Sequence, residues 1–249
     1  MCRHLAYLGA PVALAELLLD PPHALARQAW APRDMRGGGT INADGFGVAW
    51  YPQGGAEPVR YRSAMPIWSD AALPALAAAT ASGAVLAAVR SATVGMPVTE
   101  TAAAPFAEGR WLFSHNGVVR GWPGSVVKVA GRLPVQDLVT LDAPTDSALL
   151  WALVRDRLRA GVPPADAVAE VVAEVELAAP GSRLNLLLTD GAQIVATTLG
   201  HALSVRADSD GVLVSSEPLD PGAAWQPVPE NHLLAATAST VHLTPLGRS

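Results

Sequence analysis

The residue with the clearest chemical potential is the cysteine at position 2. Once Met1 is removed, Cys2 carries a thiol and a free α-amine, so that one residue supplies both a nucleophile and a base. Reference pKa values of about 7.7 to 8.0 for the amine and about 8.5 for the thiol allow an appreciable thiolate fraction near neutral pH. The competing interpretation is a small, inert hydrophobic residue at the start of an edge strand.

An amide side chain lies next to a glycine in the run His115-Asn116-Gly117, which follows the strand-like residues 111–113. We expect this run where a strand turns, with the Asn116 amide and the unshielded N–H of Gly117 side by side. Two such donors suit an oxyanion hole. An Asn-Gly hairpin turn explains the same pair by backbone conformation alone.

Two charged residues could anchor the two ends of an amino acid. Arg90 ends a predicted buried strand, where its planar guanidinium suits two-point binding of a carboxylate, and a structural ion pair is the alternative. Asp146 could hold an ammonium group, although it is equally well explained as the N-cap of a helix. Each of these residues is ambiguous when taken singly.

The elements that must position these residues also follow from the sequence. Alternating or continuous apolar runs predict strands over 3–8, 45–51, 58–62 and 84–90, with more near His201, Val212 and Val241. Helical periodicity predicts one helix over 146–159, capped by Asp146 or Ser147, and a second from near Pro164. Segments 184–189 and 193–198 flank Asp190-Gly191, which predicts a hairpin with a two-residue type I′ turn.

The order of these elements favours an α+β layered fold with largely antiparallel sheets, because strand groups are separated by a helical pair without regular βαβ alternation. We expect residues 1–249 to form a single domain, with loops at 36–40 and 219–229 inside it. The nineteen uncharged residues between Asp70 and Arg90 are long enough for a membrane span, but polar and helix-breaking residues interrupt the run. We therefore expect a helix followed by a buried strand in this segment.

Composition excludes several classes of function. The net charge is -5 with no basic stretch, so nucleic acid is not an expected partner. Lys128 is the only lysine, and no Gly-x-Gly-x-x-Gly follows a predicted strand, which excludes the common nucleotide-binding loops. With one cysteine and no histidine pair at helical spacing, the chain has no common metal-binding motif, and we expect no metal and no cofactor. A single cysteine also cannot form an intrachain disulfide, so we expect a reducing, cytoplasmic location.

Several motifs together resemble a known family. MCRHLAYLG, NADGFGVAWY, VRSATVGMP, SHNGVV and TDSALLW come in the order seen in class II glutamine amidotransferases, which are N-terminal nucleophile hydrolases. A closer resemblance, extending through RLNLLLTDG, ATTLG and SSEPLD, is to the γ-glutamyl hercynylcysteine sulfoxide amidohydrolases of ergothioneine biosynthesis. The resemblance implies an αββα four-layer sandwich, and cofactor-free cleavage of a γ-glutamyl amide through a thioester.

The resemblance also implies a role for each candidate residue: Cys2 as nucleophile, Asn116 and the N–H of Gly117 as oxyanion hole, Arg90 for the α-carboxylate, Asp146 for the α-ammonium, and Thr93 lining the glutamyl pocket. The expected partner is a small γ-glutamyl substrate, with no nucleic acid, membrane or obligatory protein partner. Because no synthase domain follows Ser249, we expect hydrolysis itself to be the purpose, with the mature chain starting at Cys2.

Two alternatives remain open at this stage. One is a glutaminase subunit that supplies ammonia to a separate synthase. The other is a secreted binding module, because residues 5–15 resemble a signal peptide whose removal would also remove Cys2. Tyr7, Gly9 and Pro11 interrupt the apolar run and weigh against that second alternative.

Overall fold

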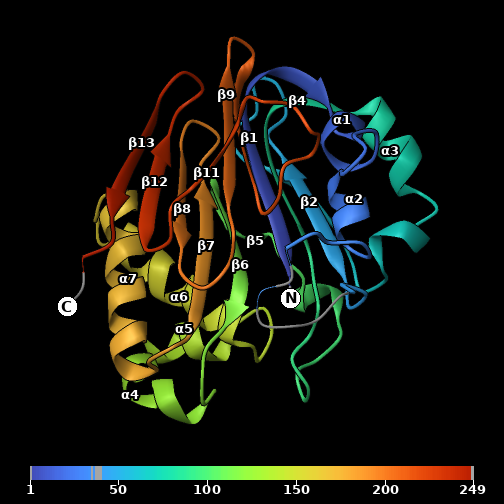
Figure 1. Ribbon diagram of the computed structural model, residues 1–249. Coiled ribbons are helices and arrows are strands. Elements are labelled where there is room, and N and C mark those ends of the chain that lie inside the picture. The colour runs from blue at the N-terminus through green and yellow to red at the C-terminus, as the bar shows by residue number, and fades with distance from the viewer. Residues whose placement is uncertain (1, 35, 37–40, 248–249) are drawn as a thin grey trace.

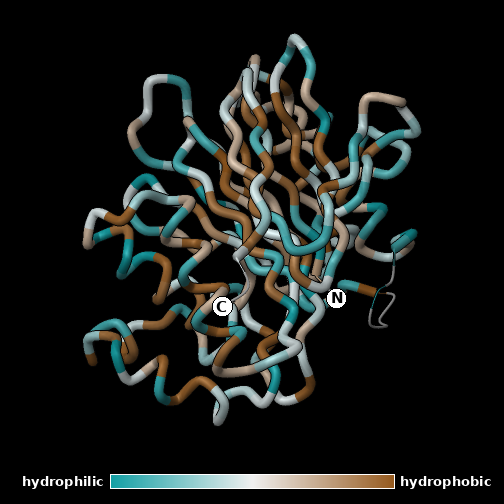
Figure 2. The backbone as a smooth tube through the Cα atoms, turned by 60° about the vertical axis from the view of Figure 1, so that its left-hand side comes forward, coloured by the Kyte–Doolittle hydropathy of each residue, from teal (hydrophilic) through white to brown (hydrophobic). Residues whose placement is uncertain are grey.

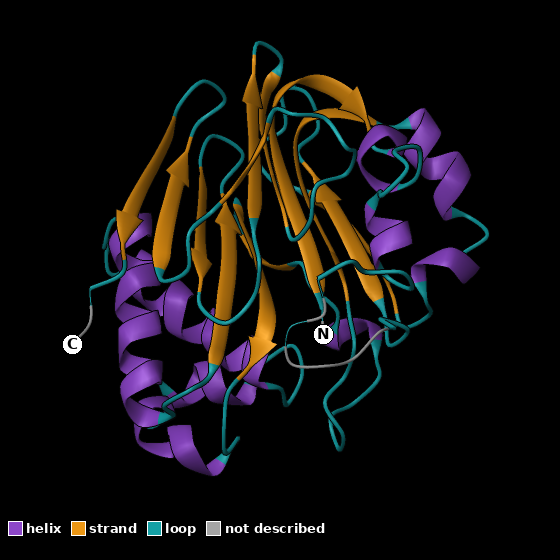
Figure 3. Cartoon of the chain, viewed as in Figure 1, coloured by secondary structure: helices purple, strands orange, loops and turns teal. Residues whose placement is uncertain are grey.

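The computed structural model describes residues 2–34, 36 and 41–247, and it arranges them in four layers. Two antiparallel sheets are stacked face to face in the middle, and helices cover both outer faces (Figures 1 and 3). The expected αββα sandwich is therefore confirmed. Most of the loop expected at 36–40 lies outside the described residues.

The first sheet has seven strands in the order β11-β9-β10-β1-β4-β2-β3. Their bounds are β1 (Arg3–Ala13), β2 (Phe46–Trp50), β3 (Val59–Ser63), β4 (Ala81–Val89), β9 (Ser204–Asp208), β10 (Gly211–Ser215) and β11 (Trp225–Pro227). The chain thus begins on the central strand, between β10 and β4.

The second sheet has six strands in the order β13-β12-β8-β7-β6-β5. Their bounds are β5 (Phe106–Glu108), β6 (Trp111–Val118), β7 (Arg183–Thr189), β8 (Ile194–Thr198), β12 (His232–Ala236) and β13 (Val241–Pro245). The sequence predicted β7, β8 and β13 but did not single out β12, and it assigned the residues of β11 to a loop.

Helices form the outer layers. The helices against the first sheet are α1 (Ala15–Leu18), α2 (Leu25–Gln28), η1 (Ile67–Ser69) and α3 (Leu73–Ala79). The helices against the second sheet are η3 (Gly124–Val126), α4 (Val127–Ala130), α5 (Val135–Val139), α6 (Asp146–Arg159) and α7 (Pro164–Ala178). A short helix, η2 (Glu100–Ala102), precedes β5. None of the helices in the described ranges combines the length and apolar character that a membrane crossing requires.

Strand side chains alternate between two apolar cores, as the twofold period of a strand requires. In β1, Ala6 and Leu8 face the core between the sheets, whereas Leu5 and Tyr7 pack toward α1–α3. A third core lies between the second sheet and α6 and α7. Figure 2 shows hydrophobic residues concentrated along the strands in the middle of the molecule.

The helix predicted over 146–159 is confirmed, but its N-cap is Thr145 instead of Asp146 or Ser147. The Thr145 hydroxyl accepts a hydrogen bond from the backbone N–H of Ala148 at 3.2 Å. Asp146 is already the first helical residue, so its carboxylate does not perform the capping that the sequence allowed.

The hairpin of β7 and β8 is confirmed, whereas its predicted two-residue turn is wrong. Thr189 pairs with Ile194, so the connection spans residues 190–193. A type I′ turn needs a positive φ at both central residues, and only Gly191 has one, at 85°. The Asp190 carboxylate instead stabilises the wider loop by accepting the N–H groups of Ala192 and Gln193, each at 3.0 Å.

The segment that resembles a signal peptide is built into the fold. Residues 5–13 belong to β1, which pairs with a strand on each side, and α1 follows directly. The apolar run is thus explained by a buried central strand. Removing it would take out the middle of the first sheet.

Candidate active site

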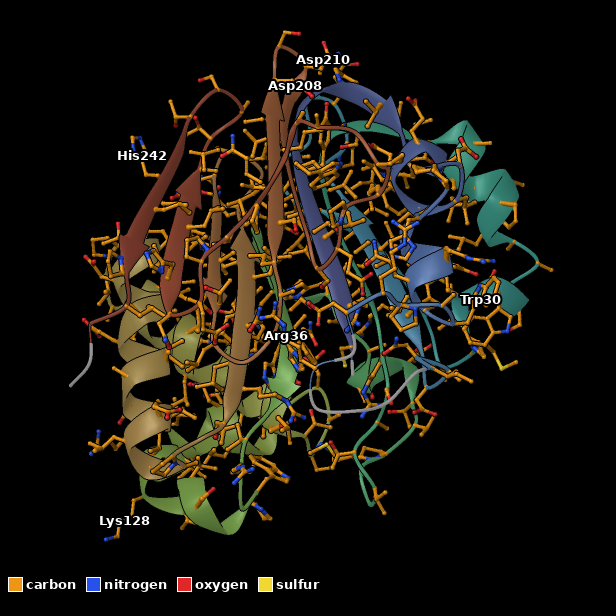
Figure 4. All side chains as sticks on the ribbon, viewed as in Figure 1. Trp30, Arg36, Lys128, Asp208, Asp210 and His242 are labelled. Carbon is orange, nitrogen blue, oxygen red and sulfur yellow. The ribbon has the colours of Figure 1, made fainter. Side chains whose placement is uncertain are left out.

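Cys2 stands immediately before β1, at the end of the sheets opposite the β9–β10 hairpin tip that carries Asp208 and Asp210 (Figures 1 and 4). The alternation along β1 places Cys2 and His4 on the side of the strand that faces the other sheet. Its partly buried thiol lies 3.8 Å from the carbonyl oxygen of Ser91. Cys2 lines a small cavity of about 20 Å³. The same cavity is also lined by Arg90, Phe106, Ser114, His115 and Ser147.

Arg90 is held at the end of β4 by its backbone. Its N–H donates to Gly45 at 2.8 Å and its carbonyl accepts from the N–H of Asp44 at 3.0 Å. The guanidinium donates to the carbonyl oxygen of Pro97 at 2.8 Å. Ion pairs among the described residues do not include Arg90, although it is only 9% exposed. A buried cation with spare donors remains available for an anion.

Asp44 is a supporting residue that the sequence reasoning did not select, although NADGF was among the motifs. Besides its backbone bond to Arg90, its carboxylate accepts the N–H of Ala92 at 2.8 Å. Gly45 has φ 119°, a conformation that glycine adopts at little cost. The Asp-Gly pair inside that motif was the signal that could have found this support.

Asn116 and Gly117 lie inside β6 and pair with Asn185 and Leu184 of β7, so the turn expected at this point is wrong. The glycine is required by a close approach. A Cβ at position 117 would lie 1.8 Å from the carbonyl oxygen of Arg183, and Gly117 does not have a positive φ. The competing hairpin-turn interpretation is thereby removed.

The Asn116 side chain is buried, at 1% exposure, yet neither its nitrogen nor its oxygen has a hydrogen-bond partner among the described residues. Buried amides are nearly always bonded, because leaving one unpaired is costly. Its neighbour across the ladder, Asn185, uses both amide atoms, on His201 and Leu199. The Asn116 amide is therefore free to bond a substrate oxygen.

The strand arrangement leaves room for a second donor. β5 pairs with β6 only at residues 111–113, so from Ser114 onward one side of β6 has no paired strand in the described sheet. Alternate backbone N–H groups on that side are not used by a ladder. Gly117 lies in this half-paired stretch.

Asp146 is 5% exposed and lies in the first turn of α6. One carboxylate oxygen accepts the N–H of Val119 at 3.0 Å, and the other accepts the N–H of Ser147 at 2.8 Å. The first bond ties the carboxylate to the chain that leaves β6, three residues after Asn116. Both oxygens keep lone pairs for an ammonium group.

The His115 side chain lies on the face of β6 opposite to that of Asn116, because side chains alternate along a strand. One ring nitrogen, Nε2, lies 2.9 Å from the carbonyl oxygen of Arg183, so that nitrogen carries the proton; the other, Nδ1, accepts from the Ser147 hydroxyl at 3.0 Å. Burial lowers the pKa of His115, and the charge of Asp146 opposes this shift. His115 is thus a structural residue that joins β6 to α6.

Thr93 is exposed and lines a second cavity, of about 430 Å³, together with Val118 and Val119. Of the six predicted site residues, Cys2 and Arg90 share the small cavity, and Thr93 lies on the second. Asn116 and Gly117 lie on β6 between the residues that line the first cavity, Ser114 and His115, and Val118, which lines the second. Asp146 contacts Val119, which also lines the second cavity. In the described part of the chain, His, Cys, Asp and Glu side chains form no group of three or more that could hold a metal ion.

Comparisons with known proteins show which family and which relatives the chain resembles. Residues 25–208 match the family described as glutamine amidotransferases class-II. The chain is 43% identical over 246 residues to a gamma-glutamyl-hercynylcysteine sulfoxide hydrolase of Mycolicibacterium smegmatis, covering 99% of this chain and 100% of that protein. A Mycobacterium tuberculosis protein of the same name is 43% identical over 249 residues, covering 100% and 98%.

A solved structure is also similar over its whole length. The glutamine aminotransferase class-II domain protein from Silicibacter pomeroyi superposes with a TM-score of 0.72 at 27% identity, covering 99% of this chain and 100% of that one. The four-layer arrangement is therefore shared with a relative of similar extent.

Proposed function

The chain belongs to the class II glutamine amidotransferases, and on that premise we propose that it hydrolyses the γ-glutamyl amide bond of γ-glutamyl hercynylcysteine sulfoxide. The products are glutamate and hercynylcysteine sulfoxide, and the step belongs to ergothioneine biosynthesis. The observation that supports this choice of substrate is the similarity to hydrolases of that name, which covers both chains almost completely.

Cys2 is the proposed nucleophile, with its own α-amine as the base after Met1 has been removed. The amine takes the thiol proton as the sulfur attacks the γ-carbonyl carbon, and it returns a proton to the leaving nitrogen as the C–N bond breaks. Water then attacks the thioester, which releases glutamate and restores the thiol. A residue ahead of Cys2 would turn the amine into an amide and remove the base.

The Asn116 amide N–H and the backbone N–H of Gly117 are proposed to stabilise the negative oxygen that forms during both steps. What supports this is the buried, unpartnered amide on the same strand as the half-paired glycine. Donors fixed in place before the reaction need no reorganisation when charge develops, which is the source of their catalytic effect.

Arg90 and Asp146 are proposed to bind the α-carboxylate and α-ammonium of the glutamyl group, with Thr93 lining the pocket. Both charged residues are buried and held by backbone bonds, so they offer rigid two-point anchoring. Such positioning can supply several kcal/mol of rate enhancement. The cytosol keeps free thiols reduced, which suits the single cysteine of this chain, and we propose a cytoplasmic location for that reason.

The deciding experiment measures glutamate release from the sulfoxide substrate and from glutamine side by side, on protein whose intact mass shows loss of Met1, with Cys2→Ala as the blank. We expect selective, Cys2-dependent release from the sulfoxide. Preference for glutamine would instead indicate a subunit that supplies ammonia. Release from neither compound would contradict a γ-glutamyl hydrolase.

A further inference from the structure

A buried ionic cluster lies behind Cys2, on the face of β1 that packs toward α1 and α2. Its centre is Glu217, which follows β10 and is 3% exposed. One carboxylate oxygen accepts Arg3 Nε at 3.0 Å and the N–H of Asp34 at 3.2 Å. The other accepts His23 Nε2 at 2.6 Å and the N–H of Arg33 at 2.8 Å.

The cluster reaches the nucleophile through Arg3, which is 3% exposed. While Nε and Nη2 of Arg3 hold Glu217, its Nη1 donates to the carbonyl oxygen of Cys2 at 3.1 Å. Ladder pairing of β1 starts only at Arg3, with Val89. The Cys2 carbonyl therefore takes its direction from the Arg3 side chain.

This contact has a particular consequence for a chain that starts at Cys2. A terminal residue is joined to the protein only through its carbonyl group, so the torsion ψ and the side-chain torsion χ1 set the positions of its amine and thiol. Holding the carbonyl oxygen fixes the plane of the peptide group between Cys2 and Arg3, and with it the position of the Cys2 α-carbon and the direction of the bond about which ψ turns. The contact of the thiol with the Ser91 carbonyl oxygen then restrains rotation about that bond. Arg3 can hold the Cys2 carbonyl only if its own guanidinium is immobile, which the Glu217 carboxylate ensures by two contacts and the Asp34 carbonyl oxygen by a third.

We propose that Glu217 and Arg3 form a positioning pair that holds the α-carbon of Cys2, and so places its α-amine and thiol, for attack on the γ-glutamyl carbonyl. The inference rests on the proposed function. Neither residue touches the substrate; the pair acts through the peptide group of Cys2. Burial opposes ionisation of Glu217, but the bonds from His23 and from the N–H groups of Arg33 and Asp34, together with the charge of Arg3, lower its pKa and keep the carboxylate ionised.

The test is Glu217→Gln in processed protein. Four donors converge on the carboxylate, and a glutamine amide offers them one accepting oxygen, so the Arg3 anchor loosens while side-chain size is kept. We expect kcat to fall by about 10- to 100-fold with KM within about threefold of the parent value, because misplacement of reacting groups costs turnover more than binding. Arg3→Lys should behave alike, since lysine lacks the planar fork.

A matched control separates positioning from a general loss of stability. Asp137 in α5 is a buried carboxylate, 5% exposed, that holds Arg155 at 3.0 Å and Arg159 at 2.9 Å in the opposite helical layer. Asp137→Asn should lower the thermal midpoint comparably but leave kcat unchanged. If Glu217→Gln keeps the parent kcat while folded, or loses only the activity expected from its unfolded fraction, the positioning role is wrong.

Labelling of Cys2 gives a second readout that does not require turnover. A γ-glutamyl chloromethyl ketone needs an oriented thiol, whereas iodoacetamide does not. We expect Glu217→Gln to slow labelling by the ketone by about tenfold or more relative to iodoacetamide. An unchanged ratio would overturn the positioning role. If the parent protein cleaves neither γ-glutamyl substrate, the proposed function fails, and the labelling ratio alone decides on the pair.

Discussion

Replacing Asn116 by leucine should separate catalysis from stability more cleanly than any other change in the site. The amide makes no hydrogen bond within the described part of the chain, so an apolar side chain of similar size breaks no internal hydrogen bond. A buried, unpaired amide costs about 1–3 kcal/mol, and Asn116→Leu should therefore leave the unfolding free energy unchanged or raise it within that range. Loss of an oxyanion donor should lower kcat by about 10²- to 10³-fold.

The matched control is Asn185→Leu, at the position paired with Asn116 across the ladder. The Asn185 amide donates to the carbonyl of His201 at 2.9 Å and accepts the N–H groups of Leu199 at 3.0 Å and His201 at 3.1 Å. Losing three bonds at about 1 kcal/mol each costs about 3 kcal/mol. For a chain of this length the thermal midpoint should fall by about 6–12 °C, with kcat kept in the folded protein.

The assay is steady-state glutamate release together with thermal unfolding, on both variants and the parent. A kcat for Asn116→Leu within about threefold of the parent would refute the oxyanion assignment. If this variant instead lost as much stability as Asn185→Leu, the amide would be engaged in the folded protein, and the reasoning from its missing partners would be wrong.

Three further predictions concern Arg90, Asp146 and His4. Arg90→Lys should lower kcat/KM for the γ-glutamyl substrate by about 10- to 100-fold in steady-state assays, because lysine cannot form two parallel bonds to a carboxylate; near-parent kinetics would contradict this. Asp146 is proposed to bind the α-ammonium, so Asp146→Asn should narrow the difference in KM between a γ-glutamyl amide and a glutaryl amide that lacks the α-amine. The measurement compares the KM values of both substrates in the parent and in the variant. The pKa of His4, lowered to about 3 by burial, keeps it neutral when folded, so its contribution to stability is complete above about pH 6.5 and is lost as pH falls toward 3. In urea unfolding, His4→Gln should reduce the stability loss between pH 7.5 and pH 5 by about 2 kcal/mol, and an equal loss in both proteins would contradict this.

Local patterns were enough to predict the elements whose stability is decided locally. The helix at 146–159 has its apolar face, its polar start and its glycine stop within one segment, and the structure reproduces its bounds. The Asn116-Gly117 pair misled because its turn preference is also local, whereas the actual constraint comes from the Arg183 carbonyl on another strand. No short-range pattern contains that contact.

The Arg3–Glu217 contact shows the same limit at greater range, since it joins residues 214 positions apart. Sequence alone gave Arg3 no partner, and SSEPLD entered only as part of a resemblance. Both become interpretable once β10 pairs with β1 and brings position 215 beside position 5. Residue chemistry could be predicted from the sequence, but the partners that orient it depend on sheet order.

The position of β1 explains how a terminal residue can serve as the proposed nucleophile. Chain ends usually fray, because few contacts hold them. Here the chain start enters the central strand of a seven-stranded sheet, with β10 on one side and β4 on the other. The twofold period of that strand then turns Cys2 toward the space between the sheets and Arg3 toward the helical layer, where Glu217 holds it. The same alternation that builds the two cores thus gives the proposed nucleophile a rigid support on the opposite face of the strand.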